Sequence, residues 1–243
     1  IKVLDGNSNG KAHLGYMWVY RSPGTGQVYF DYRQGRGRDG PEELLKDFSG
    51  YLQTDGYQVY DGLALRNPAI ILAGCMAHAR RKFYEAQQND HPRASRALEY
   101  FGMLYHHEKH IRENAMTHDE CYQYRKEHSQ PVLEEMKQYM DEQALQVLPK
   151  STIGIAMTYS IKRWDILTRY LDDGRLEIDN NRIENAIRPL ALGRKNYLFA
   201  GSDQGAKRAA IMYSLLAMCR LKEVPPTEWL LNTLRKIPSQ PIT

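Results

Sequence analysis

The sequence predicts an α/β fold in which short strands come first and long helices follow. In the first third of the chain, apolar and aromatic residues alternate between turn signals such as "DGNSNG" and "SPGTG". A short apolar run, "AIILAG", then leads into a basic stretch, which is typical of a buried strand followed by a helix. From about Pro92 to Leu171, apolar residues recur three and four positions apart, which indicates helices.

The first strands, "IKVL", "HLGYMWVYRS" and "GQVYFDY", predict a three-stranded meander. After them, Pro41 in the first turn of "EELLKDF" and the acidic residues beside it indicate the start of a helix. A second short apolar strand stops at Asp55, and "AIILAG" forms the next strand. The predicted order of elements is therefore βββαβαβα.

Long polar segments predict that residues 92–172 form a purely helical insertion, in which Pro131 breaks or kinks the second helix. The helical pattern resumes at "NNRIENAIRPL", and two further helices close the chain. We therefore expect residues 1–91 to form the first part of a core with an incomplete first strand. Residues 173–243 would then complete that core.

Composition narrows the class of protein. The chain has 243 residues, 42% of them hydrophobic, and a formal net charge of +4, so it can build a core and permits a nucleic-acid partner. Its three cysteines are an odd number at wide spacing, which excludes a disulfide framework and favours a reducing compartment. Neither a long apolar run nor a signal sequence is visible, so we expect a soluble, cytoplasmic protein with no membrane partner.

Two carboxylates could carry chemistry. Asp55 ends a buried strand and precedes Gly56, a place from which a carboxylate can reach a crevice at a sheet edge. Taken alone, however, an Asp-Gly pair is more often a turn or helix N-cap aspartate. Glu184 shares a helix face with Asn181 and Arg188, at positions i−3 and i+4. A surface ion pair of small energetic value is the alternative for Glu184.

Basic residues follow both carboxylates and predict contacts with a polyanion. They are Arg80, Arg81 and Lys82 in the first group and Arg194, Lys195, Lys207 and Arg208 in the second. Cys75 and His78 form a Cys-x-x-His unit, which is half a zinc site at most, so we expect a structural histidine there. The histidines of "HHEKH" lack the spacing of a metalloprotease motif.

These motifs resemble a known family. The stretches "YLQTDGY", "GCMAHARRKFYEA" and "IDNNRIENAIRPLALGRKNYLFAGSDQGAKRAAIMYSLLAMCRL" are similar to the C-terminal catalytic domain of the insertion-sequence transposases of family sixty-six. The resemblance covers nearly the whole chain. It implies an RNase H-like mixed sheet with flanking helices, interrupted by the helical insertion, and an Asp-Asp-Glu triad.

By this resemblance, Asp55 is the second catalytic aspartate and Glu184 the catalytic glutamate, 129 positions later. Asn181, Arg188 and His78 would support them. The resemblance also implies that the first aspartate stands upstream of Ile1, so we expect this segment alone to lack strand-transfer activity. Neither Asp5 nor Asp31 matches its motif.

The implied reaction is metal-dependent cleavage and joining of DNA. Asp55 and Glu184 would help to hold two Mg²⁺ ions, or Mn²⁺, in a two-metal site. The partners would be transposon ends, target DNA and further copies of the protein, in a bacterial cell and associated with its nucleoid. Two alternatives stay open at this point. One is an RNase H-like nuclease without strand transfer, and the other is a non-catalytic DNA-binding or assembly fragment.

Overall fold

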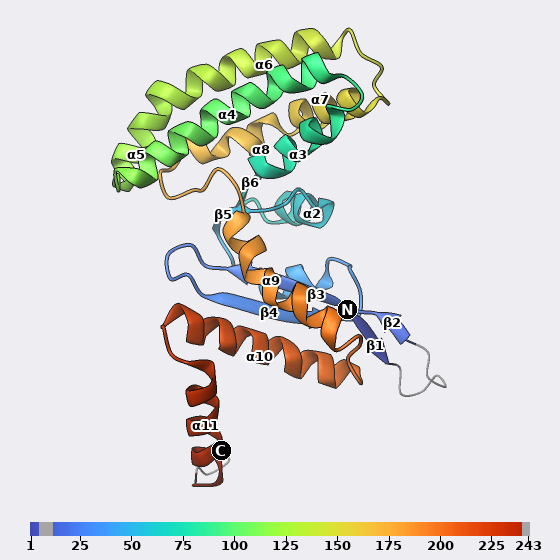
Figure 1. Ribbon diagram of the computed structural model, residues 1–243, viewed down its shortest axis with the longest axis vertical. Coiled ribbons are helices and arrows are strands. Elements are labelled where there is room, and N and C mark those ends of the chain that lie inside the picture. Colours follow the sequence, from blue (N-terminus) through green and yellow to red (C-terminus); the bar gives the residue numbers. More distant parts are fainter. Residues whose placement is uncertain (5–11, 240–243) are drawn as a thin grey trace. The chain divides into compact units, whose positions relative to one another are not determined.

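The computed structural model describes residues 1–4 and 12–239, and the chain divides into two compact units (Figure 1). The first unit comprises residues 1–40 and 181–243, and the second comprises residues 41–180. The "DGNSNG" turn signal lies outside the described residues. The division of the chain into a core interrupted by an insertion at 92–172 stays a prediction.

The first unit begins with antiparallel strands. β1 (Lys2–Leu4) pairs with β2 (Ala12–Leu14), and β3 (Tyr16–Arg21) pairs with β4 (Val28–Arg33). The expected meander of three strands is therefore four, because the middle strand is divided at Gly15. With that division, the order of elements through residue 86 follows the predicted βββαβαβα.

A close approach of Tyr32 explains the break at Gly15. A Cβ atom on Gly15 would lie 2.5 Å from the hydroxyl oxygen of Tyr32, so no larger residue fits there. The Tyr32 ring is 2% exposed, and its hydroxyl donates a 2.5 Å hydrogen bond to Oδ1 of Asp203. This bond joins β4 to the first residue of α10 (Asp203–Leu221).

Three helices complete the first unit. α9 (Asn181–Asn196) packs against β3, α10 runs along β4, and α11 (Pro226–Lys236) follows α10 (Figure 1). The 3-10 turn η3 (Ile237–Ser239) extends α11. Side chains from the strands, α9 and α10 form one apolar cluster: Val3, Phe30, Tyr32, Leu190, Ala206 and Ala210.

The second unit contains a small parallel sheet. α1 (Asp39–Leu44) precedes β5 (Gly50–Gln53), which pairs in parallel with β6 (Ile70–Ala73). The crossover between these strands is α2 (Gln58–Arg66), and α3 (Met76–Ala86) follows β6. A helical crossover is the usual connection between two parallel strands.

Helices make up the remainder of the second unit, and α4 and α6 lie side by side in Figure 1. Their bounds are α4 (His91–Glu113), α5 (His118–Tyr124), the π-helical turn η1 (Arg125–Ser129), α6 (Gln130–Ala144), α7 (Thr152–Lys162), α8 (Trp164–Thr168) and the 3-10 turn η2 (Arg169–Leu171). Apolar side chains of α3, α4, α6, α7 and α8 share one buried core that includes Phe83, Phe101, Met136 and Met157. Among the described residues, no helix has the length and apolar character needed to cross a membrane.

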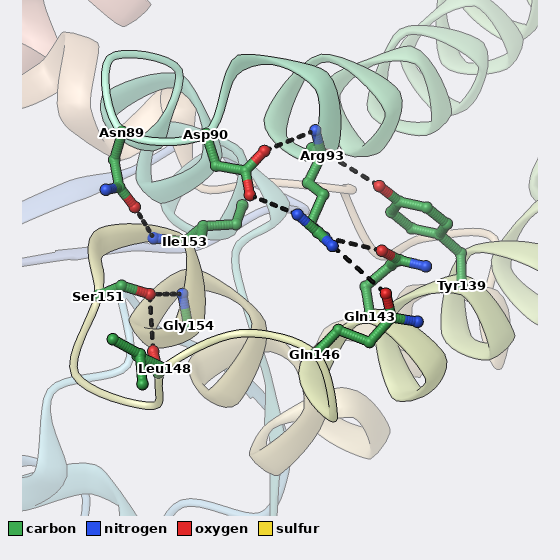
Figure 2. Close-up of polar contacts among 10 residues, drawn as sticks. All are labelled: Asn89, Asp90, Arg93, Tyr139, Gln143, Gln146, Leu148, Ser151, Ile153 and Gly154. Carbon is green, nitrogen blue, oxygen red and sulfur yellow. Dashed lines mark hydrogen bonds and ion pairs between the residues drawn. The ribbon is translucent and has the colours of Figure 1, made fainter.

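Polar contacts hold the ends of these helices together (Figure 2). Asp90 caps α4 by accepting the Arg93 backbone N–H at 3.2 Å, and it also binds the Arg93 guanidinium at 2.8 Å. The same guanidinium donates to the side-chain oxygens of Gln143 at 2.8 Å and Gln146 at 3.3 Å. One arginine therefore ties the start of α4 to the end of α6.

A buried ion pair lies at the π-helical turn. The Arg125 guanidinium donates to both carboxylate oxygens of Glu108 at 2.7 Å and to the backbone oxygen of Tyr170 at 2.9 Å. Both charged side chains are 3% exposed. Because each ion has lost its water, the pair stabilises the fold only while both partners are present.

We predict that Arg125→Met lowers the free energy of unfolding by about 3–5 kcal/mol, because it leaves the Glu108 carboxylate buried without a counter-charge. Replacing both residues, with Glu108→Leu added, is expected to recover most of this loss. Denaturant unfolding of the purified chain measures both effects.

The matched control is Lys137→Met, since Lys137 forms an i,i+4 pair with Asp141 on the partly exposed face of α6. That change is expected to cost less than about 1 kcal/mol. Equal losses for Arg125→Met and Lys137→Met would contradict the account of the buried pair.

Candidate active site

Asp55 lies just beyond the carboxyl end of β5. The backbone N–H of Thr54 continues the pairing with β6 by donating to Ala73 at 2.9 Å, and the Thr54 side chain is buried. Asp55 itself is exposed, and its Oδ1 accepts the backbone N–H of Tyr57 at 3.0 Å. The strand therefore ends two residues earlier than the sequence indicates, and the carboxylate stands in a turn at the sheet edge.

The turn is held close to α7. Gly56 has a φ of +88°, and a Cβ atom there would lie 2.8 Å from the Tyr159 hydroxyl and 3.4 Å from Nε of Arg163. Arg163 is oriented by Asp61, whose two carboxylate oxygens each accept a 3.0 Å hydrogen bond from the guanidinium. Burial raises the pKa of Tyr159, and the charge of Arg163 opposes that rise.

A second segment closes the same edge of the sheet. The Gln53 amide donates to the backbone oxygens of Gly74 at 3.0 Å and Glu177 at 2.7 Å. The backbone N–H of Met76 donates to Ile178 at 3.1 Å. After the helices of the second unit, the chain therefore returns to the carboxyl ends of β5 and β6.

Side chains reinforce this return. The Cys75 thiol donates to Oδ1 of Asn180 at 2.9 Å and accepts the Asn180 backbone N–H at 3.4 Å. The Tyr105 hydroxyl donates to Oδ2 of Asp179 at 2.8 Å. Burial raises the pKa of the Cys75 thiol, which keeps the neutral form that makes these bonds. His78 is half-buried in the first turn of α3.

Glu184 belongs to the first unit. It lies in the first turn of α9 and is half-buried, whereas Asn181 and Arg188 are exposed on the same helix. Leu190 anchors the later turns of α9 in the apolar cluster of that unit. The helix continues through Pro189, whose ring removes one backbone N–H from the helical hydrogen bonds.

The predicted polyanion contacts are distributed over three helices. Arg80 and Arg81 are exposed on α3, whereas Lys82 is half-buried with its Nζ 4.7 Å from the centroid of the Tyr159 ring. The Lys82 side chain thus contacts Tyr159, which lies beside the turn of Asp55. The three consecutive basic residues therefore do not form one exposed group. The remaining four are exposed on α9 and α10: Arg194, Lys195, Lys207 and Arg208.

Among residues 1–4 and 12–239, no group of three or more His, Cys, Asp or Glu side chains has the arrangement of a metal site. Asp55, His78 and the first three basic residues belong to the second unit, and the other predicted site residues belong to the first.

Comparison with known proteins identifies the family. A model of the family described as "Transposase IS66 family" matches residues 1–208, which include Asp55 and Glu184. The chain belongs to the IS66 family of transposases. The resemblance that the sequence motifs indicate is thereby confirmed.

Curated relatives of this IS66-family chain are found in Sinorhizobium fredii (strain NBRC 101917 / NGR234). The uncharacterized protein y4hP is 33% identical over 257 residues, covering 96% of this chain and 46% of its own length. The uncharacterized protein y4qI is 35% identical over 244 residues, covering 94% of this chain and 45% of its own length. The chain thus spans less than half the length of these relatives. No solved structure matches it.

Sequence patterns do not indicate several of the residues that lie at this edge of the sheet. Gln53 and Tyr105 tie the returning segment to the sheet, and the Asp61–Arg163 pair lies beside the turn of Asp55. The partner of Gln53 is 124 positions away along the chain, that of Tyr105 is 74 positions away, and Asp61 and Arg163 are 102 positions apart. No local sequence pattern indicates contacts over such separations. The family resemblance of "TDGY" indicates the carboxylate of Asp55 but not the residues that contact its turn.

We predict that Gly56→Ala lowers the free energy of unfolding by about 1–2 kcal/mol, because its left-handed backbone disfavours a Cβ atom. The added methyl also meets the Tyr159 hydroxyl at 2.8 Å. Thermal unfolding of the purified chain measures the effect.

Gly62→Ala is the matched control, because Gly62 lies inside α2 with no heavy atom within 4 Å of an added Cβ. That change is expected to stabilise the chain by about 0.5–1 kcal/mol. A neutral or stabilising effect of Gly56→Ala would show that the turn beside Asp55 is not held as described.

Proposed function

We propose that this chain supplies the carboxylates Asp55 and Glu184 to the active site of a DNA transposase that cleaves and joins DNA ends. The observation that carries the proposal is membership of the IS66 transposase family, whose model matches residues 1–208, a range that includes both carboxylates. The further proposal is that the two units belong to one RNase H-like fold, with the helices of residues 92–172 as an insertion.

The order of strands supports this fold. Antiparallel strands come first, and the parallel pair β5 and β6 follows with a helical crossover. In open α/β sheets, ligands bind beyond the carboxyl ends of the strands. Asp55 stands at such an end, exposed and immediately after the buried Thr54.

The path of the chain supports a role for Glu184 at the same site. Cys75 holds Asn180 next to the carboxyl end of β6. Glu184 follows Asn180 by only four positions, so the covalent chain limits the distance between their Cα atoms to about 14 Å. After the helices that lie between Asp55 and Asn180 in the sequence, the chain therefore returns to the edge of the sheet at which Asp55 stands.

The donor set suits a hard divalent cation. Exposed carboxylate oxygens are the ligands that Mg²⁺ and Mn²⁺ prefer, and Asp55 and Glu184 are both carboxylates. When bound, two such ions would supply the charge that activates the attacking oxygen and stabilises the leaving oxygen of an in-line displacement at phosphorus. Cys75 does not belong to this set, because its thiol is buried and bonded to Asn180.

Other residues of the chain would position the DNA. Asn181 and Arg188 share a face of α9 with Glu184 and would orient the carboxylate or contact the phosphate that is cut. The exposed basic residues of α9 and α10 would hold the DNA backbone without reading its sequence. Two transposon ends must be held together for joining, which is the proposed reason for an oligomer.

We predict that Glu184→Gln, placed in the transposase that contains this chain, lowers transposition frequency more than a hundredfold. The amide keeps the shape of the side chain but loses the charge that would bind metal, and even outer partners of metal ligands cost about 10–100-fold when mutated. Transposition in cells is the readout. DNA binding and the melting temperature of the purified chain are expected to change little.

Glu127→Gln serves as the control, since Glu127 is another glutamate with a side chain that is 77% exposed. It is expected to transpose normally. Retained transposition by Glu184→Gln would refute the catalytic role, and a large fall in melting temperature would favour the ion-pair interpretation. Cleavage of DNA without joining, measured with a pre-cut end, would identify a nuclease instead.

A further inference from the structure

The turn that joins α9 to α10 presents apolar side chains to solvent. Leu198 is 68% exposed, the largest value for a large apolar side chain among the described residues of the first unit, and Phe199 beside it is 46% exposed. Both residues thus leave a large part of their apolar surface in contact with solvent. They are therefore available to a ligand.

The backbone of this turn is strained. Leu198 has a φ of +56°, and the Phe199 N–H donates to the backbone oxygen of Tyr197 at 2.5 Å, which closes a three-residue turn of the rarer kind. After a helix, this left-handed conformation is usually taken by glycine or asparagine. A leucine held in it costs stability, and such strain clusters at ligand-binding positions.

Both sides of the turn are fixed. On the helical side, the Tyr197 N–H donates to Gly193 at 3.1 Å, and Tyr197 is bonded through its hydroxyl to Tyr213 at 3.4 Å. A Cβ on Gly193 would lie 2.5 Å from the Tyr213 hydroxyl. On the other side, Ala200 exchanges backbone hydrogen bonds of 2.9 Å with Lys2 and Leu4. The turn is thus an exposed projection with hydrogen bonds on both sides.

Charge indicates what the projection binds. From Asn185 to Ser202 the sequence has no acidic residue, and it contains three basic ones, Arg188, Arg194 and Lys195. Arg194 lies close enough to oppose the rise in the pKa of Tyr197 that burial causes. Apolar tips flanked by cations suit a nucleic acid, whose bases stack on apolar and aromatic side chains while its phosphates bind cations.

We propose that Leu198 and Phe199 insert against unpaired or distorted bases at a DNA end, while Arg194 and Lys195 contact the neighbouring phosphates. This assignment rests on the proposed transposase function and adds a base-contacting element to it.

The test uses the purified 243-residue chain and DNA duplexes that carry the fluorescent base 2-aminopurine next to an unpaired end. Binding of the wild type is expected to change the fluorescence through altered stacking of that base. Phe199→Ala is expected to abolish the change and to weaken binding to this duplex about tenfold, within the range for loss of base stacking. Binding to a blunt, fully paired duplex is expected to change less than about twofold.

Leu198→Gly separates strain from function. Glycine adopts a positive φ at little cost, so this variant is expected to melt at the same or a higher temperature and yet lose the fluorescence change. Leu192→Ala is the control, because Leu192 is a 57% exposed apolar residue of α9 outside the turn. It is expected to keep both the fluorescence change and the affinity.

A full fluorescence change in both Phe199→Ala and Leu198→Gly, with DNA bound, would overturn this proposal and leave the transposase function standing. Failure of the wild type to bind any DNA would overturn both proposals. Tight binding of anionic lipid vesicles through the same two side chains, with no effect on bound DNA bases, would also overturn it.

Discussion

Residues 177–180 lie far along the chain from β5 and β6, yet hydrogen bonds hold them at the carboxyl ends of these two strands. The candidate site depends on these contacts. Gln53 bonds Glu177, Met76 bonds Ile178, and Cys75 bonds Asn180. These contacts fix where the sequence emerges from the second unit. α9, the helix that carries Glu184, begins at the next residue of the chain.

The helices of residues 91–171 have a structural role in these contacts, because they connect the sheet to the segment that returns to it. Their shared core, the Arg93 contacts and the buried Glu108–Arg125 pair hold a long excursion in one shape. Because Arg125 also donates to the backbone oxygen of Tyr170, the ion pair reaches the turn that precedes the returning segment. If this helical segment is rigid, its first and last residues stay at a defined distance from one another, which a flexible segment would not ensure.

Local sequence patterns predicted the elements better than their junctions. Alternating apolar residues indicated the early strands, but the division at Gly15 depends on the Tyr32 ring, 17 positions away and on another strand. Pro131 marked an irregular helix, yet the π-helical turn at Arg125–Ser129 precedes it, where Arg125 reaches Glu108. Asp55 was found from its strand and motif. The partners around it were not, because their contacts are tertiary.

Asp55 and Glu184 are proposed to bind the same metal ions, and iron-directed cleavage of the protein can locate such a shared site. Fe²⁺ in the site of Mg²⁺, with ascorbate and peroxide, produces radicals that cut the nearby backbone. Cuts are expected near both residue 55 and residue 184, and both cuts are expected to disappear in Asp55→Asn. A cut near one carboxylate that persists without the other would contradict a shared site.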